Sequence, residues 1–159
     1  MATIQQAFGT KTAYTMGNTG TLATDAFRSG PAVDNSSDKF LDVLVSVQLA
    51  NGSGTVGDLK AWRLWVAGTL DSTSEDWTDT IAADTDTVTP TDPPNLIQVS
   101  IVHAPAASTT YKAGPVSLAQ CFGGVMPYKW FLVFENKTNI TSASSPITAE
   151  YMGIEAETT

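Results

Sequence analysis

Cysteine and histidine are almost absent from this sequence. Cys121 is the only cysteine and His103 is the only histidine. One cysteine excludes a disulfide within the chain, and these two residues are too few for a zinc site, which needs three or four ligands. A serine–histidine–aspartate relay would depend on His103, but no Gly-x-Ser-x-Gly motif supplies its nucleophile. We therefore predict no enzyme, no metal site and no cofactor, and we expect Cys121 to pack as a small apolar side chain.

Positive charge and long hydrophobic runs are also scarce. Eight basic residues oppose 16 acidic residues, which gives a formal net charge of −8. Nucleic-acid binding is not expected, because contacts with phosphates require a surface rich in lysine and arginine. No apolar run reaches the ~18 residues of a membrane-spanning helix, and the first residues show no secretory signal. These absences favour a cytoplasmically made protein that binds neither nucleic acid nor membranes.

The sequence does contain a series of short segments with the character of β-strands. Between Phe40 and Ala50, apolar residues occupy every second position, which is typical of a strand with one buried face. Tyr128–Glu135 is almost continuously apolar, which favours a central strand buried on both faces. Further strands are expected over Leu59–Gly68, Leu96–His103 and Ile147–Ile154. Pro115–Phe122 fits either a strand or one helical turn, and residues 136–146 are expected to form a polar loop.

Short strands separated by glycine, proline and asparagine turns, without an amphipathic helix, predict an all-β protein. We expect an antiparallel β-sandwich of either jelly-roll or immunoglobulin-like topology, since strand patterns alone do not separate the two. Residues 1–37 are polar and interrupted by glycine, so they are predicted to form an extended N-terminal arm with the first weak strands. Residues 38–159 are predicted to form a single sandwich domain.

The segment 69–94 differs in composition from the rest of the chain. It carries seven acidic residues and no basic residue. A connection of this length is expected to be functional, mobile or partly stranded, and we predict one short strand near Asp79–Val88. Calcium is the best candidate metal for so many oxygen atoms, but the loop lacks the glycine and the final glutamate of an EF-hand. A solvated acidic loop is therefore the preferred interpretation.

The four tryptophans support an alternative interpretation. In the strand predicted over Leu59–Gly68, Trp62 lies on one face and Trp65 lies on the other with Arg63. This strand is therefore expected to face the core on one side and a loop or another subunit on the other. Because flat aromatic side chains also stack on sugars, a carbohydrate-binding module remains an alternative, with Trp65 and Trp77 as its candidate residues.

Four stretches of the chain resemble a family of small β-rich structural proteins of tailed bacteriophages. The stretches are Ala7–Met16, Ala32–Leu49, Pro93–Gly124 and Met126–Thr138. The segment from Asp71 to Asp92 has no counterpart in this resemblance. The resemblance implies a virion component of the phage head, and it brings no active-site residues to the chain.

The resulting hypothesis is a capsid decoration protein that binds the outer surface of the head and stabilises it. Its expected partners are the major capsid protein and further copies of itself, as a trimer. It would be assembled in the host bacterial cytoplasm and located on the virion exterior, where its acidic surface is kept away from the packaged genome. The candidate contact residues are Ile4, Phe8, Tyr14, Trp65 and Trp77. A tail, collar or fibre component is the alternative role within the virion.

Overall fold

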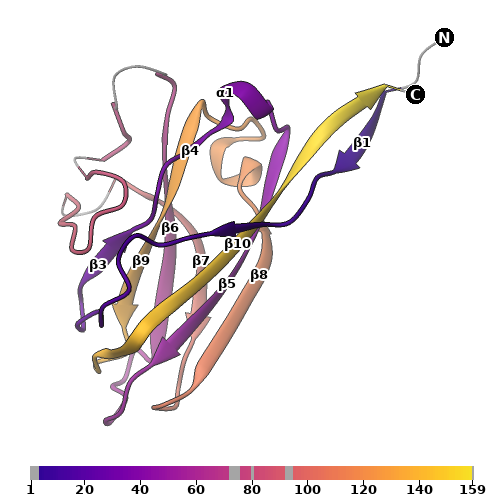
Figure 1. Cartoon of the computed structure of the whole chain (residues 1–159). Coiled ribbons are helices and arrows are strands. Elements are labelled where there is room, and N and C mark those ends of the chain that lie inside the picture. Colours follow the sequence, from indigo (N-terminus) through magenta and orange to yellow (C-terminus); the bar gives the residue numbers. More distant parts are fainter. Residues whose placement is uncertain (1–3, 72–75, 80, 92–94, 159) are drawn as a thin grey trace.

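The computed structural model describes residues 4–71, 76–79, 81–91 and 95–158. In these residues the chain forms ten strands, arranged in two antiparallel five-stranded sheets (Figure 1). The helical segments of the described residues are short: α1 (Asn35–Asp38) and the 3-10 helix η1 (Ala119–Phe122). The predicted all-β, antiparallel fold is therefore confirmed, and the two sheets are consistent with a β-sandwich.

The first sheet, called sheet A, contains the first and the last described strand. Its strands are β1 (Ile4–Phe8), β2 (Thr12–Tyr14), β5 (Asp42–Asn51), β8 (Thr110–Ser117) and β10 (Ser142–Thr158). Their order is β1-β10-β5-β8, and β2 also pairs with β10. The long strand β10 organises this sheet, because it pairs with β1, β2 and β5.

The second sheet, called sheet B, contains the remaining five strands. They are β3 (Phe27–Ser29), β4 (Val33–Asp34), β6 (Ala61–Thr69), β7 (Ile97–His103) and β9 (Lys129–Lys137). Their order is β3-β9-β6-β7, and β4 also pairs with β9. From β4 onward, every connection between successive strands passes from one sheet to the other, except the connection from β6 to β7.

The main core lies between the sheets and is built from alternate residues of the long strands. In β5, Val43, Val45, Val47 and Leu49 are buried, which confirms the strand predicted from the alternating pattern. Sheet B contributes Trp62, Leu64, Val66, Trp130, Leu132 and Phe134 to the same cluster. Burying a large apolar side chain stabilises the folded state by ~1.5–3 kcal/mol, so this core holds the two sheets together.

Strand β9 is buried on both faces, as its unbroken apolar sequence predicts. Its Phe131 and Val133 point away from the main core and pack into a second hydrophobic cluster. The acidic segment supplies Ile81 and Val88 to this second cluster, Leu96 joins it from just before β7, and Trp65 packs against it from β6. The acidic segment therefore covers the outer face of sheet B, and the second face of β6 packs against a loop, as expected.

The described residues between positions 76 and 91 contain no strand, so the strand predicted near Asp79–Val88 is wrong. A single bridge pairs Val88 with Phe27. Side-chain hydrogen bonds hold this stretch in place instead. The carboxylate of Asp84 accepts a hydrogen bond of 2.9 Å from the backbone N–H of Gly17, and the guanidinium of Arg28 binds the carboxylate of Asp86. These long-range contacts do not follow from the local sequence pattern.

The ends of the strands decide two further expectations. Strand β9 continues to Lys137 and β10 begins at Ser142, so much of the predicted polar loop over residues 136–146 is strand. The pairing of β10 with β5 shifts register between Ser142 and Ile147, which accommodates this polar stretch as an irregularity in the sheet. The segment Pro115–Phe122 contains both predicted alternatives, because β8 ends at Ser117 and η1 follows.

The described residues before position 38 contribute strands to both sheets. Strands β1 and β2 pair with β10, whereas β3 and β4 pair with β9. In Figure 1, β1 and the last part of β10 project beyond the two sheets as a two-stranded ribbon. This ribbon brings residues 4–8 and 154–158 together at one end of the molecule.

Candidate functional site

The projecting ribbon is a two-stranded structure with two chemically different faces. In the ribbon, Ile4 pairs with Thr158 and Phe8 pairs with Ile154. Because side chains alternate along a strand, one face carries Ile4, Gln6, Phe8, Ile154 and Ala156. The other face carries Gln5, Ala7, Glu155 and Glu157. Ile4 is 72% exposed and Phe8 is 66% exposed. The ribbon therefore has one mainly apolar face, on which Ile4 and Phe8 are open to solvent, and one face that carries negative charge.

The ribbon forms because β10 is longer than its partner β5. Pairing between β5 and β10 ends at Asp42 and Ile154, and beyond this point β10 pairs only with β1. In the described residues, no strand pairs with the outer edge of β1. A sheet edge of this kind leaves backbone N–H and C=O groups available to another chain. Two of the sequence-predicted contact residues, Ile4 and Phe8, thus lie on an exposed and accessible element.

Tyr14 has a different position from the other two residues of the predicted arm. Its ring is buried and stacks on Trp130 with 5.8 Å between ring centroids. Its hydroxyl donates a hydrogen bond of 2.7 Å to the carbonyl of Pro31 and accepts one of 2.9 Å from the N–H of Leu132. Burial raises the pKa of this hydroxyl, so Tyr14 stays neutral. Tyr14 is therefore a core residue of its own chain and does not belong to an exposed contact surface.

Trp65 is half-buried beside a set of charged side chains on the outer face of sheet B. Its indole N–H donates a hydrogen bond of 3.1 Å to the buried carboxylate of Glu135. That carboxylate lies 3.6 Å from the guanidinium of Arg63 and 3.3 Å from the ammonium of Lys137. Lys137 also contacts Asp25 at 2.8 Å, and the hydrogen bond to Asp25 raises the pKa of Lys137. These charges neutralise one another, which favours a structural role for Trp65.

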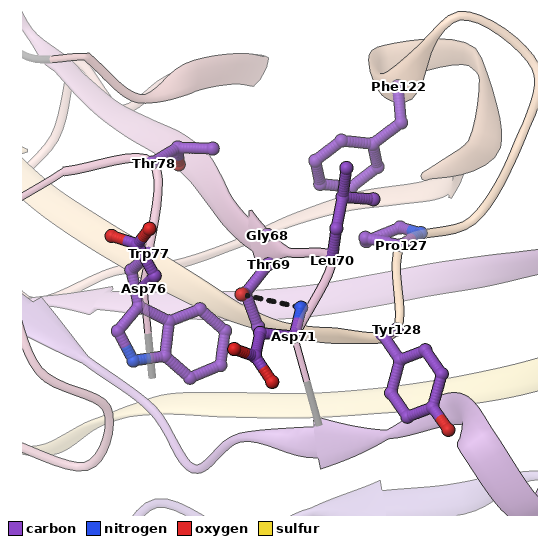
Figure 2. Close-up of a pocket in the computed structure, with 10 residues that line it drawn as sticks. All are labelled: Gly68, Thr69, Leu70, Asp71, Asp76, Trp77, Thr78, Phe122, Pro127 and Tyr128. Carbon is purple, nitrogen blue, oxygen red and sulfur yellow. Dashed lines mark hydrogen bonds between the residues drawn. The ribbon is translucent and has the colours of Figure 1, made fainter. Parts of the chain in front are cut away.

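Trp77 forms part of the wall of an open cavity of about 650 Å³ (Figure 2). The cavity is lined by Gly68, Thr69, Leu70, Asp71, Asp76, Trp77, Thr78, Phe122, Pro127 and Tyr128. These residues come from the end of β6, from the acidic segment that follows it, from the end of η1, and from the connection between η1 and β9. Pockets of this size accommodate small molecules or single side chains of a partner.

Backbone hydrogen bonds fix the three segments around the cavity. The carbonyl of Gly68 accepts a bond of 3.2 Å from the N–H of Thr78, and the carbonyl of Thr69 accepts one of 3.0 Å from the N–H of Tyr128. The hydroxyl of Thr69 accepts a further bond of 3.1 Å from the N–H of Asp71. A side chain on Gly68 would approach the ring of Phe122 to 2.7 Å, so glycine at this position permits close packing of the cavity floor. The end of β6 therefore anchors both walls.

The acidic residues of the described chain are spread over separate structural contacts. Asp84 and Asp86 hold the loop to the N-terminal segment, and Asp79 accepts hydrogen bonds from the N–H groups of Thr91 and Asn95. No three histidine, cysteine, aspartate or glutamate side chains cluster as metal ligands within the described residues. Residues 72–75, part of the proposed calcium loop, lie outside the described residues. His103 is exposed at the end of β7.

The described residues contain no helix with the length and apolar character needed to cross a membrane.

We expect Cys121 to react slowly with alkylating reagents. It packs against the main core, and burial together with the nearby charge of Asp42 raises the pKa of its thiol. The thiolate is the reactive form, so a higher pKa lowers the reactive fraction near neutral pH. With iodoacetamide at about pH 8, the folded protein should be modified several-fold more slowly than N-acetylcysteine, and unfolding in urea should remove the difference. Equal rates for the folded protein and the free thiol would contradict this prediction.

The sequence identified some residues of these surfaces and missed others. Ile4 and Phe8 were predicted as contact residues, and Trp77 was predicted as a contact or sugar-binding residue. The contributions of Phe122, Pro127 and Tyr128 to the cavity were missed. No local signal marks them, because they lie more than 40 residues from Trp77 in the sequence and only the fold brings them to the same cavity.

Comparisons with protein-family models, with curated proteins and with solved structures gave no match to this chain.

Proposed function

We propose that this chain is a structural protein of a bacteriophage virion, a decoration protein that binds the outer surface of the capsid. In this role the protein acts by binding and not by catalysis. The projecting ribbon carries the proposal, because it presents the large apolar side chains of Ile4 and Phe8 to solvent at one end of the molecule. The strand topology and the charge of the chain give further support.

We further propose that the sandwich has jelly-roll topology. If β1 with β2 and β3 with β4 each count as one interrupted strand, each sheet has four strands. The pairing is then nested: the first strand pairs with the eighth, the second with the seventh, the third with the sixth and the fourth with the fifth. Nested pairing is what results when one long hairpin is rolled into two sheets. Jelly rolls are common in viral capsid proteins and in lectins, which makes a capsid role plausible without assigning it.

In this proposal the extended N-terminal element is the ribbon, and its partner is the major capsid protein. The apolar face with Ile4 and Phe8 would pack into an apolar groove of the capsid surface. The opposite face carries Glu155 and Glu157, and residues 4–8 and 154–158 include no basic residue. The complementary capsid surface would therefore carry lysine or arginine beside the groove. The free edge of β1 would add strand pairing to this contact.

The location and assembly of the protein follow from the same proposal. An acidic chain with a net charge of −8 is repelled by packaged DNA, which favours the outer surface of the head. Further copies of the chain would surround each binding site as a trimer, after assembly in the cytoplasm of the bacterial host. Binding to the assembled lattice in preference to its dissociated subunits would stabilise the capsid by linkage.

The test uses capsids of the phage whose genome encodes the chain. The protein should bind these particles and raise the temperature at which they break. Phe8→Gln and Ile4→Gln, which remove apolar contacts from the exposed face, should weaken binding by about tenfold or more each, as expected for central contact residues. Leu59→Gln is the matched control, because Leu59 is 61% exposed but lies outside the ribbon.

Three results would overturn the proposal. The first is that the protein does not bind capsids. The second is that the ribbon variants bind as well as the Leu59→Gln control. The third is density for the chain at the tail, collar or fibres in electron microscopy of the virion, which would assign it to one of those structures instead.

A further inference from the structure

The cavity beside Trp77 has a charge pattern that selects its ligand. Asp71 and Asp76 are among its lining residues, and none of the described residues that line it is a lysine, arginine or histidine. Figure 2 shows the carboxylate of Asp71 projecting toward the space between the indole of Trp77 and the ring of Tyr128. An anionic ligand would be repelled by these carboxylates and would find no cationic partner. A positively charged group would be attracted by both.

Aromatic rings form much of the remaining cavity surface. Tyr128 is 43% exposed, and Phe122 and Trp77 are half-buried. The indole of Trp77 packs edge-on against the buried ring of Phe131, with 4.6 Å between ring centroids. This contact holds the indole of Trp77 in position before any ligand enters, and the backbone bond from Tyr128 to Thr69 fixes the chain that carries the Tyr128 ring. Pre-positioned rings lose little conformational entropy when they bind a ligand.

We propose that this cavity binds an alkylammonium group. The faces of tryptophan and tyrosine rings attract cations through their quadrupole, and carboxylates attract the same charge through a longer-range Coulomb interaction. The methylene or methyl groups attached to the nitrogen pack against the apolar ring surfaces. The combination therefore suits an organic cation better than a bare metal ion, which requires several oxygen ligands at short distance. The inference is independent of the proposed capsid role.

Two other kinds of ligand fit the cavity less well. A purely apolar ligand would displace water from the carboxylates of Asp71 and Asp76 and would bring no positive charge in its place. A neutral sugar could stack on the rings and bond to the hydroxyls of Thr69, Thr78 and Tyr128, but it carries no charge to match the carboxylates of Asp71 and Asp76. An ammonium group carries that charge, and the carboxylate and hydroxyl oxygens of the lining can accept its hydrogen bonds.

The test measures binding of choline to the full-length protein by NMR titration, with 3,3-dimethylbutanol as the uncharged isostere of choline. Choline should shift the signals of residues around the cavity and the isostere should bind about tenfold or more weakly, since it lacks the charge. Equal binding of the two compounds would overturn the proposal, because the cavity would then select shape and not charge. No binding of choline would also overturn it, as would tighter binding of a neutral monosaccharide such as glucose.

Two variants remove the proposed contacts without altering the backbone. Tyr128→Leu removes a partly exposed ring, and Asp76→Asn removes the charge of an exposed carboxylate with little change of shape. Each should weaken choline binding about threefold to tenfold. Asp58→Asn is the matched control, because Asp58 is exposed and precedes β6 whereas the cavity follows the end of β6. Unchanged affinity in both cavity variants, or an equal loss in the Asp58→Asn control, would refute the assignment.

The same titration separates two sources of the alkylammonium group. Nα-acetyl-lysine amide represents a lysine side chain of a partner protein, and choline represents a small quaternary amine. Tighter binding of the lysine compound assigns the cavity to a protein partner, and tighter binding of choline assigns it to a small molecule. Both results support recognition of the ammonium group itself.

Discussion

Replacing Asn136 with alanine is expected to lower the free energy of unfolding by about 3–5 kcal/mol. The side chain is completely buried and makes four hydrogen bonds. Its amide group donates to the carbonyls of Leu22 at 3.0 Å and Ile140 at 2.8 Å. Its oxygen accepts from the N–H of Thr138 at 3.0 Å and from the hydroxyl of Thr138 at 2.7 Å. Alanine would leave several of these buried groups without partners.

Urea denaturation of the purified protein measures this effect. Asn95→Ala is the matched control, since Asn95 is exposed and its recorded hydrogen bonds use its backbone N–H. The control should change stability by less than about 0.5 kcal/mol. A loss below about 1 kcal/mol for Asn136→Ala would mean that the turn between β9 and β10 does not depend on this side chain.

Replacing Asp86 with alanine is expected to lower the free energy of unfolding by about 2–3 kcal/mol. The carboxylate of Asp86 is the ion-pair partner of Arg28, whose side chain is only 1% exposed. Without it, the buried guanidinium would keep only backbone carbonyls as acceptors, among them those of Gly20 at 2.8 Å and Thr21 at 3.2 Å. The expected loss of stability is smaller than the ~3–5 kcal/mol typical of a fully buried ion pair. The reason is that Asp86 itself is partly exposed and water can reach its position.

Two comparisons separate the charge from the general effect of a substitution in this loop. Asp86→Asn keeps an acceptor for Arg28 and should lose less stability than Asp86→Ala. Asp58→Ala changes an exposed aspartate with no recorded hydrogen bond or ion pair, and it should be nearly neutral. Hydrogen exchange should also become faster at the N–H of Val88, which bonds to the carbonyl of Phe27. Equal stability of Asp86→Ala and Asp58→Ala would show that this ion pair does not hold the loop.

Buried polar residues explain where sequence-based expectations were wrong. Asn51 lies just beyond the strand predicted between Phe40 and Ala50, yet it is buried in β5, where its side chain accepts a hydrogen bond of 2.8 Å from the indole N–H of Trp62. Asn136 was expected in a polar loop and is completely buried in β9. Amide side chains resemble loop residues when only their polarity is considered. Their burial depends on partners that lie far away in the sequence, such as Leu22 for Asn136.

The sequence by itself determined the all-β class and the positions of the main strands. Alternating burial in β5 and continuous burial in β9 are local properties, because successive side chains of a strand point to opposite faces. Only the tertiary structure decided that Tyr14 enters the core, that the acidic segment covers sheet B, and that Trp77 and Tyr128 share one cavity. Each of these arrangements depends on pairing between distant strands, and that pairing satisfies backbone and side-chain groups that have no partner nearby in the chain.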